Sequence, residues 1–457
     1  MSRRYWVETL GCPKNEVDSA KLVGTLTAEG YEPAGEPQQA DLVVVNTCAF
    51  IEAARQDSID AILALGDARK DGAHLVVTGC LAERYGAELA DALPEVDKVA
   101  GFGIPVTVSS KPPKHPKGLN SPQLGDGGDS GVLGHENPFD LLNLPRPKSD
   151  APWAYVKVAE GCDRKCGFCA IPSFRGRQRS RSRAAILAEV EALDVAEVVL
   201  VAQDLASYGR DIGRAGDIIP LVTDVGRRVP RTRLLYLYPS ELSDGLIEVM
   251  GETGCHYFDL SLQHASRAHL RRMRRWGDGD RFAERIATIR RRYPDAAFRS
   301  SFIVGYPGET EEDHDALLRF LDESQLDWAG FFAYSPEAGT YAATLPDVVP
   351  AGLVTERLLE CGELQDVITA ARRHDLVGQT VTVLVDRPGV GRSHREAPEI
   401  DGVIHLPVAD TAELVGQFTD ARIVASAGPD LDAVVAAPPG RHQPPLEPLV
   451  QTRAALA

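Results

Sequence analysis

The chain has 457 residues, of which 44% are hydrophobic and 25% are charged, and its formal net charge is −17. A single hydrophobic core does not usually organise a chain of this length, so we expect roughly two to four domains. There is no apolar run of about eighteen residues and no apolar stretch near the N-terminus. We therefore expect a cytoplasmic protein with neither a membrane span nor a secretory signal. The negative charge repels phosphate backbones and favours a basic protein as partner, so we do not expect direct RNA binding.

The first hundred residues alternate between strand-like and helix-like segments. The valine-rich strand candidates are RYWVETLGC, DLVVVNTC and HLVVTGC, and each precedes a segment with helical periodicity. This alternation predicts a parallel sheet covered by helices, and we place the N-terminal α/β domain at residues 4–119. From about 104 to 150 proline, glycine and serine dominate, so we expect a linker in which little is buried.

Strand–helix alternation returns in a central α/β domain, which we place at residues 148–376. Its six strand candidates, from AYVKVAEG to WAGFFAYSPEAG, predict a partial (β/α) barrel with its site at the carboxyl ends of the strands. The segment 377–445 has short β-like pieces divided by glycine, proline and aspartate, which predict a small β-barrel domain. We expect the tail after it to be disordered.

Three cysteines of the N-terminal domain, Cys12, Cys48 and Cys80, each follow a predicted strand. The carboxyl ends of parallel strands meet at one edge of a sheet, so we expect the three thiols to lie together. The alternative is three separate buried cysteines that act as small apolar side chains. Their equivalent positions favour a three-thiolate metal site.

A second group is the C-x3-C-x2-C motif of Cys162, Cys166 and Cys169, directly after the first strand of the central domain. No fourth Cys or His follows at the spacing of a structural zinc site, and a ferredoxin-type cluster also needs four cysteines. An iron–sulfur cluster with one iron left open agrees best with this count. Cys255 and Cys361 have no companions and are expected to be core residues.

The C-x3-C-x2-C motif, with Phe168 before its last cysteine, resembles that of the radical S-adenosylmethionine (SAM) superfamily. Together with the N-terminal cysteines and a C-terminal barrel that resembles TRAM domains, it makes the chain similar to the methylthiotransferases. LGCPKNEVDSAKL, EGCDRKCGFCAIPSFRGRQRSR and LQHASRAHLRRMRR resemble the branch that modifies an aspartate of small-subunit ribosomal protein number twelve. The sister branch, which modifies an adenosine of transfer RNA, typically has a GCQMN-type motif where this chain has GCPKN.

The resemblance implies a transferase that uses SAM and two [4Fe-4S] clusters. The C-x3-C-x2-C cysteines would hold the cluster whose open iron binds SAM, and SAM cleavage would give the radical that removes a hydrogen from the aspartate β-carbon. The N-terminal cysteines would hold the cluster that carries the sulfur, and a second SAM would supply the methyl group. A ribosomal protein, free or in the ribosomal particle, and an electron donor protein are the implied partners. Because the cofactors carry the difficult step, we assign no side chain as a catalytic acid or base.

The resemblance also implies that SAM contacts the carboxyl ends of the central strands. Our candidates are two glutamines and two glycines, Gln203, Gln263, Gly305 and Gly308. Asp204, Ser261 and His264 are further candidates, although His264 could instead hydrogen-bond a loop. A turn is the alternative explanation for the glycines. The arginine-rich segments 175–183 and 271–275 are expected mostly as solvated surface, with contact to SAM or ribosomal RNA as the alternative.

The C-terminal segment 376–437 has four basic and nine acidic residues. A barrel that binds RNA is usually basic, so this one is better suited to a basic ribosomal protein. Two other functions remain open from the sequence. One is methylthiolation of transfer RNA, and the other is a non-enzymatic iron–sulfur electron carrier or redox sensor, which would bind metal without cleaving SAM.

Overall fold

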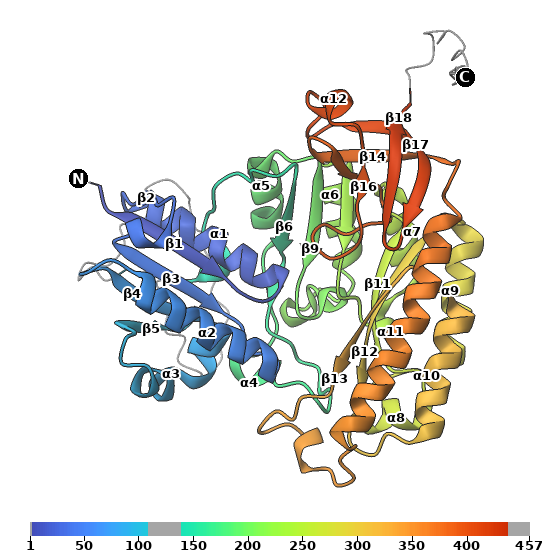
Figure 1. The fold of residues 1–457 in the computed structure, drawn as a ribbon, viewed down its shortest axis with the longest axis horizontal. Coiled ribbons are helices and arrows are strands. Elements are labelled where there is room, and N and C mark those ends of the chain that lie inside the picture. Colours follow the sequence, from blue (N-terminus) through green and yellow to red (C-terminus); the bar gives the residue numbers. More distant parts are fainter. Residues whose placement is uncertain (1, 108–138, 437–457) are drawn as a thin grey trace, which may run out of the picture.

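The computed structural model describes residues 2–107 and 139–436. Figure 1 shows an N-terminal α/β part in blue, a central barrel coloured green to orange, and a small red β-barrel. This arrangement confirms the predicted fold class. In the described ranges, no helix is both long and apolar enough to cross a bilayer.

The N-terminal sheet has five parallel strands in the order β2-β1-β3-β4-β5. The strands are β1 (Arg4–Thr9), β2 (Glu32–Pro33), β3 (Leu42–Thr47), β4 (His74–Gly79) and β5 (Lys98–Ala100). Helices α1 (Pro13–Ala28), α2 (Glu52–Ala68) and α3 (Cys80–Ala92) connect and cover them. β3 is buried along its whole length because helices pack on both faces of the sheet. The three longer strands are those predicted from the valine-rich segments.

The segment predicted as an unburied linker is partly buried, contrary to expectation. Val106, Phe139 and Leu141 are at most 5% exposed and pack in the core on the α1 face of the N-terminal sheet. The buried ammonium of Lys21 in α1 donates a hydrogen bond to the carbonyl of Leu142. The apolar residues of FDLLNL thus complete the N-terminal core. The remaining part of the segment, 108–138, lies outside the described residues.

The central barrel has six parallel strands in two sheets, β6-β9-β10 and β11-β12-β13, which meet at a bridge between Leu237 and Leu260. The strands are β6 (Trp153–Lys157), β9 (Glu197–Val201), β10 (Arg231–Leu234), β11 (Tyr257–Gln263), β12 (Ala297–Val304) and β13 (Trp328–Ala333). All six correspond to predicted strands. The larger helices are α5 (Arg183–Leu193), α6 (Ile218–Gly226), α7 (Asp244–Glu252), α9 (Gly279–Arg292), α10 (Glu311–Ser324) and α11 (Ala351–His374). Shorter elements lie near the strand ends: β7 (Ala159–Glu160), α4 (Ile171–Arg175), β8 (Arg179–Ser180) and α8 (Arg267–Arg272).

The C-terminal domain is a closed barrel in the order β14-β15-β16-β18-β17. Its elements are β14 (Thr380–Arg387), β15 (Val390–Arg392), β16 (Ile404–His405), α12 (Val408–Thr411), β17 (Phe418–Ala427) and β18 (Asp430–Val435). Alternating apolar residues such as Val383, Val385 and Ile423 fill it. The tail predicted to be disordered lies largely beyond residue 436, outside the described residues.

A buried cluster of charges joins the C-terminal barrel to the central barrel. Glu197 of β9 is fully buried and accepts hydrogen bonds from Arg233 at 2.7 Å and from Arg392 of the C-terminal barrel at 3.0 Å. Arg231 lies 3.7 Å from the same carboxylate. Such a cluster holds the two barrels in one orientation, because separating them would leave buried charges unpaired.

Candidate functional site

The three predicted cysteines of the N-terminal domain lie at one edge of its sheet, and we call them the N-terminal trio. Cys12 precedes α1, Cys48 follows β3, and Cys80 is the first residue of α3 after β4. Gly11 has φ +99°, and a Cβ there would lie 3.0 Å from the Cys48 sulfur, so the turn at Cys12 packs directly against Cys48. Burial first, and then the neighbouring Cys80 and Cys12, raise the pKa of Cys48 to about 11. The structure therefore brings together the thiols of three separate strand ends.

The central trio, Cys162, Cys166 and Cys169, lies in the loop that follows β7. Backbone contacts fix this loop: Gly167 N–H donates to the carbonyl of Met273 at 2.8 Å, and its own carbonyl accepts from Ala342 N–H at 2.8 Å. A Cβ at Gly167 would lie 2.8 Å from Tyr306 Oη, so a residue larger than glycine would clash with this tyrosine. A cavity of about 270 Å³ opens beside Cys166 and Cys169.

The sulfurs of the central trio receive hydrogen bonds from the surrounding chain. The backbone N–H of Arg164 donates to Cys162 at 3.4 Å, and the guanidinium of Arg275 donates to Cys166 at 3.4 Å. Burial raises the pKa of Cys162 to about 11 and that of Cys169 to about 12. Three sulfur donors in one loop are a ligand set suited to a soft cation, whose binding would displace the thiol protons.

Arg175 connects the N-terminal trio to the central domain. It ends α4, six residues after Cys169, and its side chain is only 2% exposed. The guanidinium donates to Cys80 Sγ at 3.0 Å and to Asn15 Oδ1 at 2.7 Å, both in the N-terminal domain. It also donates to Glu160 at 3.0 Å. A residue of the central domain thereby completes the surroundings of the N-terminal trio.

Arg175 belongs to a buried network with balanced charge. Lys157 of β6 pairs with Asp18 of α1 and, at 2.6 Å, with Glu160, while Arg175 contacts both carboxylates. Two positive and two negative groups therefore face one another between the domains. The same Glu160 accepts a hydrogen bond from Gln203 Nε2 at 2.6 Å. The network thus reaches a predicted SAM-contacting residue at the carboxyl end of β9.

The predicted SAM-contacting glutamines lie at strand ends, as expected. Gln203 follows β9, and its buried Oε1 has no hydrogen-bond partner among residues 2–107 and 139–436. Gln263 ends β11 beyond an irregularity in the pairing with β12, and its φ is +74°. Asp204 instead accepts a hydrogen bond from Arg164 at 2.6 Å, and Ser261 offers its carbonyl to Arg275.

The two glycines after β12 pack against protein rather than facing open space. Gly305 has φ +80°, and a Cβ there would lie 2.4 Å from a methyl carbon of Val354 in α11. Gly308 has φ +78°, and a Cβ there would lie 2.0 Å from the guanidinium of Arg272. The positive φ and these close contacts explain why both positions are glycine.

Most arginines of the two arginine-rich segments are exposed, as expected, although some are buried. Arg177, Arg179 and most of 271–275 are exposed, but three arginines are buried: Arg175, Arg181 and Arg275. Each buried arginine has a partner that offsets its desolvation, such as Glu189 at 2.6 Å from Arg181. The two isolated cysteines, Cys255 and Cys361, are buried core residues, as predicted.

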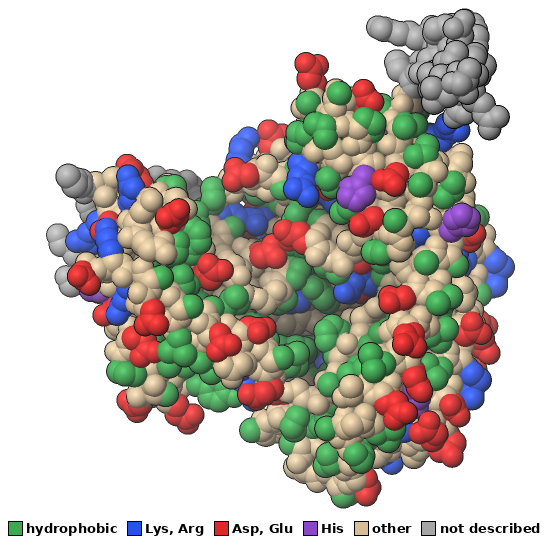
Figure 2. All heavy atoms as spheres, in the orientation of Figure 1, with side chains coloured by type: hydrophobic (Ala, Val, Ile, Leu, Met, Phe, Trp, Pro, Cys, Tyr) green, Lys and Arg blue, Asp and Glu red, His purple; other side chains and the backbone are tan. Residues whose placement is uncertain are grey.

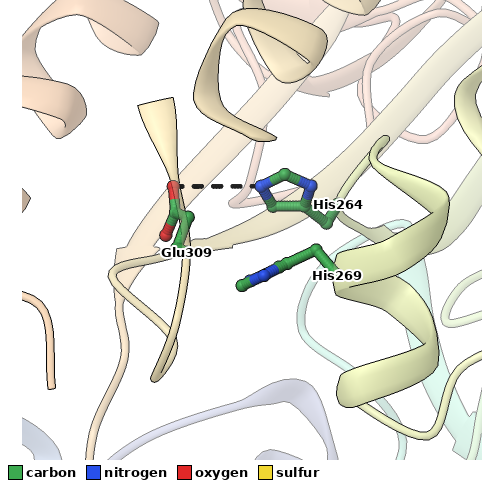
Figure 3. Close-up of side chains that lie close together, drawn as sticks. All are labelled: His264, His269 and Glu309. Carbon is green, nitrogen blue, oxygen red and sulfur yellow. Dashed lines mark ion pairs between the residues drawn. The ribbon is translucent and has the colours of Figure 1, made fainter. Parts of the chain in front are cut away.

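The sequence did not predict a third group of polar side chains, His264, His269 and Glu309, whose nitrogen and oxygen atoms lie within 4.8 Å of one another. Figure 3 shows the ring of His264 pointing toward Glu309, at 3.9 Å. His264 Nδ1 accepts a hydrogen bond from Ser266 N–H at 3.0 Å, which is the loop contact considered as its alternative role. Arg357 lies 3.5 Å from the Glu309 carboxylate and already supplies the positive charge that a metal ion would bring. We therefore regard this group as structural.

Sequence reasoning also gave no role to Lys14, in the first turn of α1. Its Nζ lies 3.3 Å from the centre of the Tyr236 ring, which follows β10 of the central barrel. Figure 2 shows the molecular surface hollowed between the N-terminal domain and the central barrel. The only feature of the sequence that pointed to the contact between Lys14 and Tyr236 was the position of Lys14, two residues after Cys12.

Family models match the three parts of this fold. Residues 4–101 match Uncharacterized protein family UPF0004, residues 156–321 match the Radical SAM superfamily, and residues 377–435 match the TRAM domain. The chain is thus a radical SAM protein with a C-terminal TRAM barrel. A radical SAM methyltransferase, TsrM from Kitasatospora setae, aligns with 82% of this chain and 90% of its own, at 15% identity and TM-score 0.47, too distant to support any argument.

Two relatives are similar over almost the whole chain. Ribosomal protein uS12 methylthiotransferase RimO of Streptomyces coelicolor is 40% identical, covering 94% of this chain and 96% of the relative. The protein of the same name from Moorella thermoacetica is 42% identical, covering 88% of this chain and 93% of the relative. The chain belongs to the RimO family of radical SAM methylthiotransferases.

Proposed function

We propose that this protein transfers a methylthio group to the β-carbon of an aspartate in ribosomal protein uS12. The relatives named for that activity align along nearly the full chain. The observation that carries the proposal is the pair of cysteine trios, one at the N-terminal sheet edge and one in the central loop. Arg175, six residues after Cys169, contacts Cys80 of the N-terminal trio. A simple electron carrier has no need for two three-cysteine sites of different construction.

Each trio suits a [4Fe-4S] cluster with one iron not held by cysteine. Three thiols, buried or partly buried, that lie at one sheet edge or in one loop are a donor set that selects iron–sulfur clusters or zinc. We assign Cys162, Cys166 and Cys169 to the cluster that binds SAM. We assign the N-terminal trio to the cluster that carries sulfur. When bound, these groups supply the reductive cleavage of SAM and the sulfur atom.

The chain itself positions these groups and shields them. We assign SAM contacts to Gln203, Gln263, Gly305 and Gly308, and the buried Oε1 of Gln203, free of protein partners in the described residues, is the best-supported of them. Glu160 orients Gln203 through the 2.6 Å hydrogen bond to its Nε2. Arg275 donates to the Cys166 sulfur and so stabilises negative charge on a bound cluster.

The C-terminal barrel suits a basic protein partner. Two of its four arginines, Arg392 and Arg395, are buried against the central barrel, so they add little to its surface charge. The exposed basic residues in 377–436 are Arg387 and Arg422, and the exposed acidic ones are Glu399, Asp410, Glu413, Asp420 and Asp432. This balance supports docking of a ribosomal protein, free or within the ribosomal particle, rather than RNA.

Several further assignments follow from this function. A cytoplasmic location suits a ribosomal substrate, and reduction of the clusters requires an electron donor protein. We place the three functional units at 4–119, 148–376 and 377–445. Phe139 and Leu141 pack in the N-terminal core, so the segment that connects the first two units contributes to the core of the first.

An anaerobic substrate comparison tests the proposal. Reconstituted protein, SAM and a reductant would be incubated with uS12 lacking the modification or with transfer RNA lacking it. We expect a mass gain of one methylthio group on the uS12 aspartate and none on the RNA. A gain only on the RNA would assign the chain to the sister activity.

A further inference from the structure

We propose that Lys14 recognises the side-chain carboxylate of the substrate aspartate, an inference that rests on the proposed function. The Nζ of Lys14 lies over the Tyr236 ring at 3.3 Å. It makes no hydrogen bond or ion pair with any residue in 2–107 or 139–436. Lys14 is half-buried, and its ammonium has no anionic partner among the described residues.

Two fully buried lysines, Lys157 and Lys21, show which partners this chain normally gives to an ammonium. Lys157 is fully buried and pairs with Asp18 and Glu160. Lys21 is also fully buried; it donates to the carbonyl of Leu142 and lies 3.8 Å from Glu189. Lys14 alone among these three has an aromatic face as its only described direct contact. The ammonium of Lys14 is therefore available to an anion from outside the chain.

The carboxylates nearest to Lys14 are already engaged. Asp259 accepts the backbone N–H of Tyr236 at 3.0 Å and pairs with Arg299 at 3.3 Å. Glu160 is held by Arg175 and Lys157. An incoming carboxylate would supply the anionic partner that the described residues do not give to Lys14.

Tyr236 is held in a conformation that presents its ring to Lys14. Its φ is +66°, which is uncommon for a residue other than glycine, and the hydrogen bond from its N–H to Asp259 fixes it. Such backbone conformations persist where the surrounding structure enforces them and often mark functional positions. The ring then orients the ammonium by a cation–π contact without neutralising it.

The position of Lys14 matches the chemistry of the proposed reaction. Lys14 is two residues from Cys12, and its contact with Tyr236 joins the N-terminal domain to the carboxyl end of a central strand. The β-carbon of aspartate is bonded directly to the carboxyl carbon. An ammonium that binds the carboxylate therefore holds the reacting carbon between the two domains that carry the trios. An adenosine base has no carboxylate, so this contact also discriminates against the sister substrate.

A double-mutant cycle on binding tests the inference. The affinity of the reconstituted protein for uS12 would be measured with the target aspartate intact and with that aspartate changed to asparagine. For the unaltered enzyme we expect the aspartate form to bind about tenfold to hundredfold more tightly, as for a hydrogen bond between charged groups. Lys14→Met should reduce this ratio to about one, and Lys14→Arg should preserve part of it. Lys70→Met, on the exposed side of the same domain, is the matched control and should leave the ratio unchanged.

Two results would overturn the inference. One is a Lys14→Met variant that retains the preference for aspartate or loses affinity for both forms equally, as a purely structural role would cause. The other is an unaltered enzyme that binds both forms equally. A failure of the proposed function is distinguished by the parallel mass measurement, in which uS12 would gain no methylthio group.

Discussion

Arg175 of the central domain donates a hydrogen bond to the sulfur of Cys80 in the N-terminal domain, at 3.0 Å. The same guanidinium reaches Asn15, Asp18 and Glu160, so it connects both domains through one buried group. Hydrogen bonds to a cysteine sulfur stabilise negative charge on a bound cluster and are one of the ways a protein adjusts its reduction potential. The two domains therefore build the surroundings of the N-terminal trio together.

Replacing Arg175 should weaken both the fold and the N-terminal site. In Arg175→Gln, Asp18 and Glu160 keep only Lys157 as a cationic partner, so a buried negative charge remains unpaired. We expect a loss of about 3–5 kcal/mol in the free energy of unfolding and a lower iron content after reconstitution. Urea denaturation and iron analysis measure these effects. Arg177→Gln, whose side chain is 92% exposed, should change neither quantity, and equal behaviour of the two variants would refute the role of Arg175.

Gly79 is predicted to tolerate no side chain. It has φ +89°, and a Cβ there would approach Asn46 Oδ1 to 2.4 Å and the backbone of Thr47 to 2.5 Å. Gly79→Ala should displace the start of α3 and with it Cys80, which lowers both the melting temperature and the iron retained by the N-terminal trio. Gly72→Ala is the matched control, because its φ is +77° but nothing lies within 4 Å of the added carbon. If both variants retain as much iron as the unaltered protein, the close contacts at Gly79 do not position Cys80.

The buried Glu197 should make the contact between the two barrels sensitive to acid. Burial tends to raise its pKa, but Arg233, Arg392 and Arg231 outweigh that effect and lower the pKa from the ordinary 4.5 to about 2. A carboxyl group with a lowered pKa in the folded state stabilises the fold above pH 4.5. This contribution is lost as the pH falls from 4.5 toward about 2.

Glu197→Gln tests this contribution directly. The variant leaves buried arginines without their carboxylate, so we expect a loss of about 3–5 kcal/mol in the free energy of unfolding at neutral pH. The dependence of stability on pH between 4.5 and 2 should also become shallower. Glu191→Gln, at an exposed ion pair with Arg228, should leave both properties nearly unchanged. An unaltered acid profile in Glu197→Gln would contradict the assignment.

Local patterns were sufficient to predict the sheets and the assembly of the cysteines. The run LVVV is continuously apolar because β3 is covered on both faces, and Cys48 follows that strand directly. Parallel pairing then requires equivalent strand ends to meet at one edge. Very short strands such as β2, of two residues, carry too little pattern to be predicted.

The buried charges could not be predicted in the same way. Arg175 lies in a segment rich in arginine, and its burial depends on Asp18 and on Asn15, about 160 residues earlier in the chain. The contact of Lys14 with Tyr236 likewise could not be predicted, because the two residues lie on different domains. Apolar periodicity is a local property, whereas the pairing of a buried charge is decided by tertiary contacts.

The most direct test of the account compares SAM cleavage and uS12 modification in the same anaerobic reactions. The enzymes are the unaltered protein and two triple alanine variants, one lacking the N-terminal trio and one lacking the central trio. Each variant should retain about four iron atoms per chain. We predict that the variant without the N-terminal trio still forms 5′-deoxyadenosine but adds no methylthio group to uS12, whereas the variant without the central trio does neither. Methylthiolation of uS12 by the variant that lacks Cys12, Cys48 and Cys80 would contradict the division of roles between the two trios.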